Sequence, residues 1–261
     1  MKTVSELRVQ IFGDGADKAA MLELYRKPYI KGFTTNPTLM RKAGVTDYRG
    51  FALDILEHIQ DRPISFEVFA DDEKEMELQA RQIAEWGENV FVKIPITNTR
   101  GESMLRLVRR LASDGIQLNV TAICALDQVQ GACQALQDGA ASFVSVFAGR
   151  IADTGRDPMP LMREAVAMVD AIVTARLIWA SPRELLNIFQ ADEVGCHVIT
   201  ATSDVLAKLP LIGKDLHKFS LETVEMFYRD AVNSGFSLPT TSGNDSAATR
   251  RKADIHSVVR S

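Results

Sequence analysis

Short apolar runs alternate with amphipathic stretches along the chain from residue 8 to about residue 200. The apolar runs are rich in Val, Ile and Phe, as buried strands are, and the stretches between them repeat apolar residues at helical spacing. The pattern predicts eight strands, at Arg8–Phe12, Gly32–Thr34, Ile64–Val68, Val90–Ile94, Gln117–Thr121, Ser142–Val146, Leu177–Trp179 and His197–Thr200, and between them helices that include Asp71–Trp86, Glu102–Ala112, Leu126–Leu136, Pro160–Val173 and Pro182–Phe189.

The order of these elements predicts an α/β fold. Strands separated by helices pair in parallel through right-handed crossovers. Eight strand–helix units within about 200 residues favour a closed, single-domain (β/α)8 barrel, or TIM barrel, over an open doubly wound sheet. Active sites in such barrels gather at the C-terminal ends of the strands, so that end is where we look for chemistry.

A further helix is predicted after the barrel, at Ser220–Val232, with Ser220 as its N-cap and its end before Gly235. Its apolar stripe must dock on its own barrel or on a neighbour's. From Pro239 the composition turns to Thr, Ser, Gly, Asn and Ala. We therefore expect one domain over residues 1–238 and a polar, flexible tail over residues 239–261.

Composition narrows the class of protein. The 261 residues are 46% hydrophobic and 25% charged, which is typical of a globular protein with one large core. The net charge is −4 and no dense Lys/Arg face occurs, which argues against nucleic acid as a partner. The absence of a long apolar run and of a signal-peptide pattern predicts a cytoplasmic protein without a membrane partner. Cys124, Cys133 and Cys196 have no C-x-x-C spacing and are expected to be reduced and mostly buried.

Strand parity selects the polar residues that face the barrel axis. In Ile64–Val68 the apolar positions share one face, so Glu67 points to the other, and the same alternation turns Lys93 inward within VFVKIPI. Five strands aim a polar group at one region, with the set Asp14, Glu67, Lys93, Asn119, Thr121 and Ser145.

Lys93 carries the most specific chemistry of this set. A lone charge in an apolar strand either reaches the rim, where it has no role, or is held where desolvation lowers its pKa. A desolvated lysine is a nucleophile toward carbonyls. The sequence has no metal-ligand spacing and no dinucleotide fingerprint, since Lys18 stands where a third glycine would follow Gly13 and Gly15. We therefore expect no metal and no organic cofactor, and lysine-imine chemistry is the interpretation that remains.

Five segments of the chain form an ordered set of motifs. They are GFTTNPTLM at Gly32–Met40, FVKIPIT at Phe91–Thr97, NVTAI at Asn119–Ile123, SVFAGRIADTG at Ser145–Gly155, and IWASPRELL with the downstream pair Gly195–Cys196. They resemble segments of the transaldolase family, the group that includes small transaldolases and fructose-6-phosphate aldolase-like enzymes. The resemblance covers residues 8 to 234 and implies a class I, Schiff-base (β/α)8 enzyme without a cofactor.

The resemblance implies a role for each matching residue. Lys93 would form the imine, Asp14 would be the general acid/base, and Glu67 with Thr121 would hold a catalytic water. The substrate-binding residues implied are Thr35, Asn36, Asn119 and Ser145 toward the donor's hydroxyls and the intermediate, Phe147 beside the water, and Arg150, Ser181 and Arg183 toward a phosphate.

Several alternatives stay open within this resemblance. Pro182 stands where relatives often carry an aromatic residue, so another anionic tail, such as a sulfonate, could replace phosphate. Glu67 and Phe147 resemble the residues that transaldolases have at these two positions, where aldolase-like relatives tend to have Gln and Tyr. The leading hypothesis is a transaldolase acting on sugar phosphates, its rivals an aldolase that releases free dihydroxyacetone and a non-catalytic sugar-phosphate binder. The resemblance also implies a homo-oligomer, a pentamer or decamer.

Overall fold

The computed structural model describes residues 2–238. The chain divides into two compact units, Met1–Ile212 and Gly213–Ser261, and each is described by itself. The predicted tail, residues 239–261, lies outside the described residues, and the extent of the predicted domain, residues 1–238, stays a prediction.

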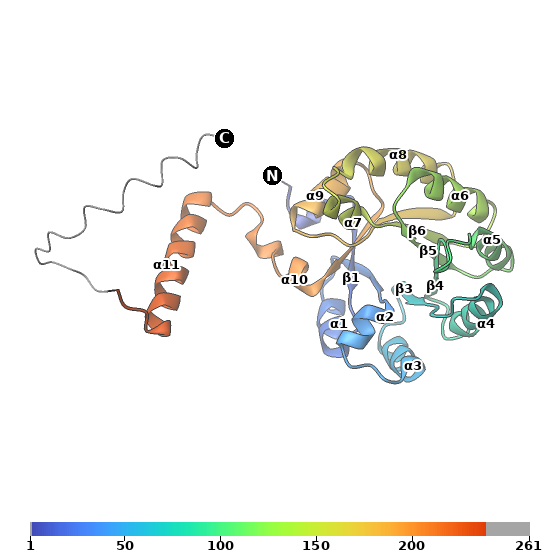
Figure 1. Cartoon of the computed structure of the whole chain (residues 1–261), viewed down its shortest axis with the longest axis horizontal. Helices are drawn as coiled ribbons and strands as arrows, with labels where there is room; N and C mark the ends of the chain where they lie inside the picture. The colour runs from blue at the N-terminus through green and yellow to red at the C-terminus, as the bar shows by residue number, and fades with distance from the viewer. Residues whose placement is uncertain (1, 239–261) are drawn as a thin grey trace, which may run out of the picture. The chain divides into compact units, whose positions relative to one another are not determined.

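The first unit is a closed barrel of eight parallel strands, each paired with its neighbours in chain order from β1 to β8 and back to β1 (Figure 1). This confirms the predicted TIM-barrel fold. The strands are β1 (Gln10–Asp14), β2 (Ile30–Thr34), β3 (Ile64–Glu67), β4 (Val90–Pro95), β5 (Leu118–Ile123), β6 (Ser142–Val146), β7 (Ala175–Trp179) and β8 (Val198–Thr202).

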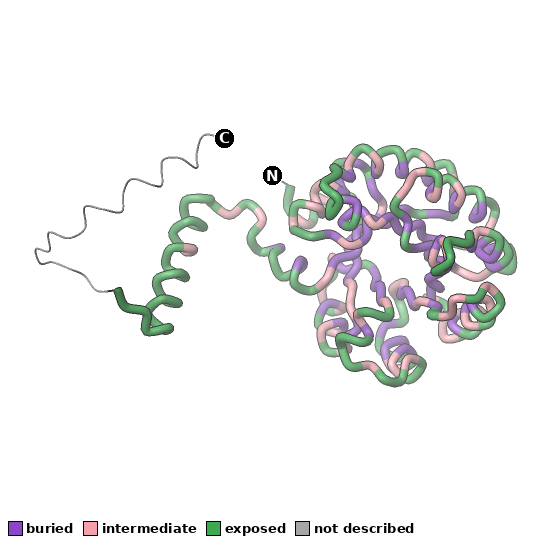
Figure 2. Tube along the Cα trace, viewed as in Figure 1, coloured by how far each residue is buried: buried purple, intermediate pink, exposed green. Residues whose placement is uncertain are grey.

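Helices surround the barrel, and Figure 2 shows buried residues concentrated on the strands and on the helix faces turned toward them. The helices of this unit are α1 (Lys18–Tyr25), α2 (Pro37–Lys42), α3 (Tyr48–His58), α4 (Glu73–Ala84), α5 (Leu105–Ser113), α6 (Leu126–Leu136), α7 (Ala148–Asp153), α8 (Met159–Asp170), α9 (Leu186–Glu193) and α10 (Ser203–Leu206), with 3-10 turns η1 (Val4–Glu6) and η2 (Leu209–Leu211).

Several predicted boundaries differ from the structure, and three of these differences have a local hydrogen-bonding cause. Strand β1 starts at Gln10 rather than Arg8, since the Arg8 and Val9 amides donate to the Asp192 carboxylate. Helix α9 starts at Leu186, since the amides of residues 183 and 184 donate to the Asn187 side chain. Helix α5 starts at Leu105, after a turn closed by the bridge between Thr97 and Ser103.

The axis of the barrel is filled by large apolar side chains below the polar ends of the strands. Phe12 meets Phe143 edge-on at 5.6 Å between ring centroids, and Phe91 lies 4.5 Å from Phe143. Gly32 makes room for this cluster, because a Cβ there would stand 2.6 Å from the Phe12 ring. The axis of the barrel is therefore a packed core and not a pore.

The second unit contains α11 (Leu216–Ser234), which replaces the predicted helix Ser220–Val232. The cap is Asp215, whose carboxylate accepts from the Lys218 amide at 2.9 Å, so Ser220 lies inside the helix and not at its start. Gly235 ends the helix in the left-handed region, with φ at 68°, as predicted. Of the helices in residues 2–238, none has the length and apolarity to cross a bilayer. Cys133 and Cys196 are buried, as expected, whereas Cys124 is exposed.

Asp192 ties the start of the chain to the barrel. Its side chain is 3% exposed and accepts from the Arg8 amide at 2.6 Å, the Val9 amide at 3.1 Å and Lys2 Nζ at 2.5 Å. Burial opposes ionisation of this carboxyl, but these donors together hold its pKa below the ordinary value. The ionised form is therefore the one that stabilises the fold.

We predict that Asp192→Ala lowers the free energy of unfolding by about 2–3 kcal/mol, because two backbone amides lose a charged acceptor. Urea unfolding measures this, with exposed Glu193→Ala as the control. A carboxyl whose pKa is depressed by folding stabilises above its unfolded pKa and stops doing so as pH falls through the folded value. The difference from wild type should therefore shrink as the pH is lowered below about 4; an equal difference at pH 3 and pH 7 would contradict the assignment.

Candidate active site

A cavity of about 450 Å³ opens at the C-terminal ends of the strands. Ten of the twelve site residues named from the sequence line it, and Thr35 and Arg183 do not. The lining comprises Asp14, Thr34, Asn36, Pro37, Thr38, Leu39, Glu67, Lys93, Asn119, Thr121, Ala122, Ser145, Phe147, Arg150, Ala180, Ser181, Thr200 and Thr202.

Lys93 on β4 is the buried amine at the floor of this cavity. The residue is 5% exposed, and its Nζ donates to the Thr35 carbonyl at 2.8 Å and lies 3.0 Å from Glu67 Oε2. The inward parity of β4 and the adjacent register of Glu67 with Lys93 on β3 and β4 bring the pair together. Thr35 thus contacts the lysine through its backbone, while its hydroxyl donates to the Ser65 carbonyl at 2.9 Å.

Asp14 ends β1 on the same inward face. Burial raises the pKa of its carboxyl, and the Lys93 charge and a hydrogen bond from Thr34 oppose that rise. Thr34 Oγ1 donates to Asp14 Oδ1 at 2.7 Å. A carboxyl whose burial favours the protonated form is suited to accept a proton near neutral pH.

Asn119 on β5 sits at the centre of a buried hydrogen-bond network. Its Nδ2 donates to Ser65 Oγ at 3.0 Å, and its Oδ1 accepts from Ser145 Oγ at 2.7 Å. The two bonds hold the amide between one hydroxyl on β3 and one on β6. Thr121, two residues further along β5, has a buried hydroxyl with no hydrogen-bond partner among residues 2–238, so that group is available to a ligand in the cavity.

Asn36 serves the fold as well as the cavity. Its Oδ1 accepts from the Leu39 amide at 3.0 Å and caps α2, with Pro37 at the first position of the helix. The capping bond consumes the carbonyl end of the side chain. The amide nitrogen is the part of Asn36 left to donate into the cavity.

Arg150 and Ser181 form one end of the cavity. Arg150 forms no ion pair with a carboxylate of residues 2–238, and its guanidinium carbon lies 5.8 Å from the centre of the Phe147 ring. Ser181 has φ at 62°, a backbone conformation that is rare for a residue with a Cβ. Gly149 allows this turn, because a Cβ at Gly149 would stand 1.5 Å from the Ser181 carbonyl oxygen.

Arg183 lies outside the cavity lining. Its guanidinium makes two bonds to the Asp153 carboxylate, one of them from Nε at 2.8 Å. Arg183 Nη1 also donates to the Ser181 carbonyl at 3.0 Å and to the Ser181 hydroxyl at 2.9 Å. In this arrangement Arg183 supports Ser181, and its charge is neutralised by Asp153.

The sequence analysis did not select Thr34, Thr200 and Ser65, three polar groups that hydrogen-bond to selected residues or to one another. Each lies on an inward strand position, below or beside a residue that was selected. Alternation along the strands could have identified Thr34 on β2 and Thr200 on β8. Gly32 and Val198 lie two residues earlier on the same strands and face the barrel axis, so Thr34 and Thr200 must face it too. Gly149 carried no signal of its own, because only the packing of α7 on the end of β7 shows the need for a glycine.

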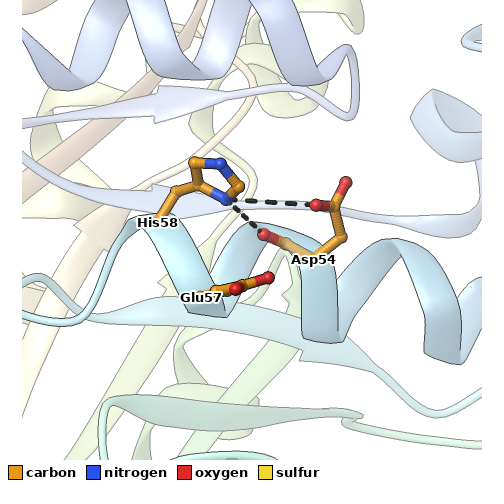
Figure 3. Close-up of side chains that lie close together, drawn as sticks. All are labelled: Asp54, Glu57 and His58. Carbon is orange, nitrogen blue, oxygen red and sulfur yellow. Dashed lines mark hydrogen bonds and ion pairs between the residues drawn. The ribbon is translucent and has the colours of Figure 1, made fainter.

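Two features away from the cavity carry no comparable chemistry. Asp54, Glu57 and His58 cluster on α3 (Figure 3), but His58 Nδ1 lies 2.7 Å from the Asp54 carbonyl and Lys18 Nζ already binds Asp54 Oδ1 at 2.6 Å, so we assign no metal there. A cavity of about 480 Å³ lined by Tyr48, Trp86 and other residues of α3 and α4 contains no buried charged side chain.

Comparison with known proteins decides the family. The chain matches the profile of the transaldolase/fructose-6-phosphate aldolase family over residues 11–242. It belongs to this family. Relatives named "probable transaldolase" include one from Dehalococcoides mccartyi, 32% identical over 81% of this chain and 96% of that protein, and one from Methanococcus maripaludis, 34% identical over 81% and 95%.

Solved structures share the fold of this transaldolase/aldolase family member at low identity. 3-Hexulose-6-phosphate synthase from Salmonella typhimurium has a TM-score of 0.51 and 13% identity, covering 76% of this chain and 89% of that one. 2,3-Dimethylmalate lyase has a TM-score of 0.50 and 12% identity, covering 92% and 89%. Identities this low support the barrel fold alone, whereas the family membership supports an enzyme of the transaldolase/aldolase class.

Proposed function

We propose that this protein is a metal-independent, class I transaldolase. It moves a dihydroxyacetone unit from a ketose phosphate, such as fructose 6-phosphate, to an aldose phosphate through an imine on Lys93. The observation that carries the proposal is a lysine 5% exposed, within 3.0 Å of Glu67 and in one cavity with Asp14, in a member of this family.

The first step joins Lys93 to the donor ketose. The neutral Lys93 amine attacks the C2 carbonyl, and loss of one water gives the protonated imine. Glu67, beside Nζ, receives the proton that the ammonium must lose and returns one to the departing hydroxyl. The unpartnered Thr121 hydroxyl supports the role implied by the family resemblance, which is to hold that water together with Glu67.

Asp14 serves the second step, cleavage of the C3–C4 bond. The carboxylate takes the proton of the C4 hydroxyl, C4 leaves as an aldehyde, and the bond electrons pass into the imine to give a neutral enamine. Addition of the enamine to the acceptor aldehyde returns the proton from Asp14. Hydrolysis of the new imine then releases the product and the free Lys93 amine.

The hydroxyls of the transferred three-carbon unit form hydrogen bonds with amide and hydroxyl side chains of the barrel. Asn119 and Ser145 are ordered by their mutual bond of 2.7 Å, and Asn36 offers its amide nitrogen. A rigid polar wall discriminates because a sugar lacking one hydroxyl leaves a buried partner unpaired, at a cost of about 1–3 kcal/mol.

The anionic tail of the substrate binds at Arg150 with Ser181. Arg150 is the cavity guanidinium that no described carboxylate neutralises, whereas Arg183 is paired with Asp153 and acts through Ser181. A guanidinium contacts a phosphate or a sulfonate with the same two-pronged geometry, so the substrate could carry either group.

Transfer rather than release is supported by Glu67 and Phe147. The Phe147 ring lines the cavity without offering a hydrogen bond to water. A carbanionic intermediate in such surroundings persists until an aldehyde arrives, because protonation is not assisted. This favours a transaldolase over an aldolase that frees dihydroxyacetone.

We also propose that the protein is a homo-oligomer, a pentamer or decamer, and that it is cytoplasmic. The apolar stripe of α11, which includes Leu221, Val224 and Phe227, supports an oligomer, since apolar stripes of this kind mark interaction surfaces.

Trapping with borohydride tests the imine. Borohydride with fructose 6-phosphate should add a reduced three-carbon or sugar adduct to Lys93 of the wild type, located by peptide mass spectrometry. Lys93→Ala should give no adduct and lose at least about 10³-fold in turnover while keeping its melting temperature, because the covalent route is gone. Lys74→Ala, an exposed lysine on α4, is the control. Turnover of Lys93→Ala within about tenfold of wild type, or no adduct in saturated wild type, would sink the proposal and favour a non-catalytic binder.

The assignment of Arg150 to the anionic tail of the substrate is tested with two acceptors that differ in one phosphate group. Arg150→Ala should raise KM for glyceraldehyde 3-phosphate about 10–100-fold and change KM for neutral glyceraldehyde little, because a charged hydrogen bond contributes about 1.5–3 kcal/mol. Arg183→Ala should have the smaller effect on the phosphorylated acceptor, since its charge is already paired. Equal loss with both acceptors in Arg150→Ala would make that arginine structural.

The choice between transfer and release is tested at Phe147. Phe147→Tyr places a hydroxyl that can order water and assist protonation of the intermediate, so the ratio of free dihydroxyacetone to transfer product should rise, and Glu67→Gln should add to the rise. Product mass with an acceptor present measures the ratio, and Phe69→Tyr, 64% exposed and outside the cavity lining, is the control. If the wild type releases mainly free dihydroxyacetone, the transaldolase assignment is wrong and the protein is an aldolase.

A further inference from the structure

Three side chains form a hydrogen-bonded row at the wall of the cavity where β8, β1 and β2 meet. Thr200 Oγ1 lies 2.5 Å from Thr34 Oγ1, and Thr34 Oγ1 lies 2.7 Å from Asp14 Oδ1. Thr200 is 5% exposed and Thr34 2% exposed. Strand β1 pairs with both β2 and β8, so the row crosses the barrel wall from one neighbour of β1 to the other.

Counting protons sets the direction of these bonds. An ionised carboxylate only accepts, so the single proton of the Thr34 hydroxyl is the one donated to Asp14. Thr34 then has no proton left for Thr200. The bond between the two hydroxyls must therefore run from Thr200 Oγ1 as donor to Thr34 Oγ1 as acceptor whenever Asp14 is charged.

We propose that Thr200 is a positioning residue for the general base: by donating to Thr34 it holds the Thr34 hydroxyl in the orientation that donates to Asp14 Oδ1, and it leaves Oδ2 as the oxygen that takes the substrate proton. No other side chain of residues 2–238 hydrogen-bonds to Asp14. Hydrogen bonds in a row strengthen one another, because each donor is polarised by the bond it accepts. Thr200 thus acts on Asp14 through Thr34.

The charged surroundings of Asp14 decide what the row changes. Lys93 from β4 lowers the pKa of Asp14 and Glu67 from β3 raises it, while burial raises it most. Arg150 lines the far end of the same cavity, and Asp17, Lys42 and Asp204 line the adjoining hollow beside Asp14. The bond from Thr34 favours the charged form of Asp14. Weakening that bond raises the pKa, so a smaller fraction of Asp14 is ionised at a given pH.

The proposal rests on the proposed function, in which ionised Asp14 is the base for C3–C4 cleavage. When kcat/KM for fructose 6-phosphate cleavage is plotted against pH, its fall on the acidic side, the acidic limb, reports the pKa of that base in the free enzyme. In Thr200→Val the limb should move up by about 0.5 pH unit, and in Thr34→Val by about 1 unit, since Thr34 touches the carboxylate. Thr200→Ser keeps the hydroxyl and should restore the wild-type limb. Thr99→Val removes a threonine hydroxyl outside the cavity lining, one that donates to Asp71, and should leave the limb in place.

A double-mutant cycle separates a role through Thr34 from any other role. If Thr200 acts through Thr34, adding Thr200→Val to Thr34→Val produces no further shift of the limb. A limb that stays in place in Thr200→Val, that moves equally in Thr200→Ser, or that moves again in the Thr34→Val background overturns the proposal. The Ser and Val variants of Thr200 decide the question alone if the double variant is unstable.

Borohydride trapping keeps the two proposals apart. Imine formation does not need Asp14 as base, so Thr200→Val should form the Lys93 adduct at the wild-type rate. If Thr200→Val forms the adduct normally and its acidic limb does not move, the role proposed for Thr200 is wrong and the proposed function stands. If the wild type forms no adduct, the proposed function is wrong, and this inference is wrong with it.

Discussion

The burial of the Lys93 amine is the constraint on which the rest of the site depends. A buried amine needs polar partners, and here the Thr35 carbonyl and the Glu67 carboxylate lie 2.8 and 3.0 Å from Nζ. Thr35 directly follows β2 and Glu67 ends β3, so the lysine joins the ends of three neighbouring strands. Of these two partners, the Glu67 carboxylate is the one that can exchange the protons that the proposed imine chemistry requires.

The barrel below this layer is rigid because it is filled. Phe12, Phe91 and Phe143 close the axis, and Gly32 is the glycine that their packing demands. A filled axis keeps water from reaching the lysine from the N-terminal end. It also holds the ends of the strands at fixed separations, which keeps Asn119 and Ser145 within hydrogen-bonding distance.

The two ends of the cavity are built differently. The end at Asp14 is made of strand residues whose hydroxyls form a row, so its geometry follows from the sheet register. The end at Arg150 is made by α7 and the segment after β7, and it depends on Gly149 admitting the strained turn at Ser181 and on Asp153 holding Arg183. Segments beyond the strand ends vary more readily than the strands, and this suits the part of the site that we propose binds the tail of the substrate.

The sequence by itself determined the eight strands, the barrel and the inward face that carries Lys93 and Glu67, because alternation along a strand is a local property that burial enforces. It did not determine where β1 and α9 begin. The buried carboxylate of Asp192 takes the amides before β1 from far along the chain, and the side chain of Asn187, in the first turn of α9, takes the amides before that helix. Only the tertiary structure decided that Arg183 is neutralised and outside the cavity lining. The pairing joins the end of α7 to the segment after β7, 30 residues further along the chain, and no periodicity along the chain encodes it.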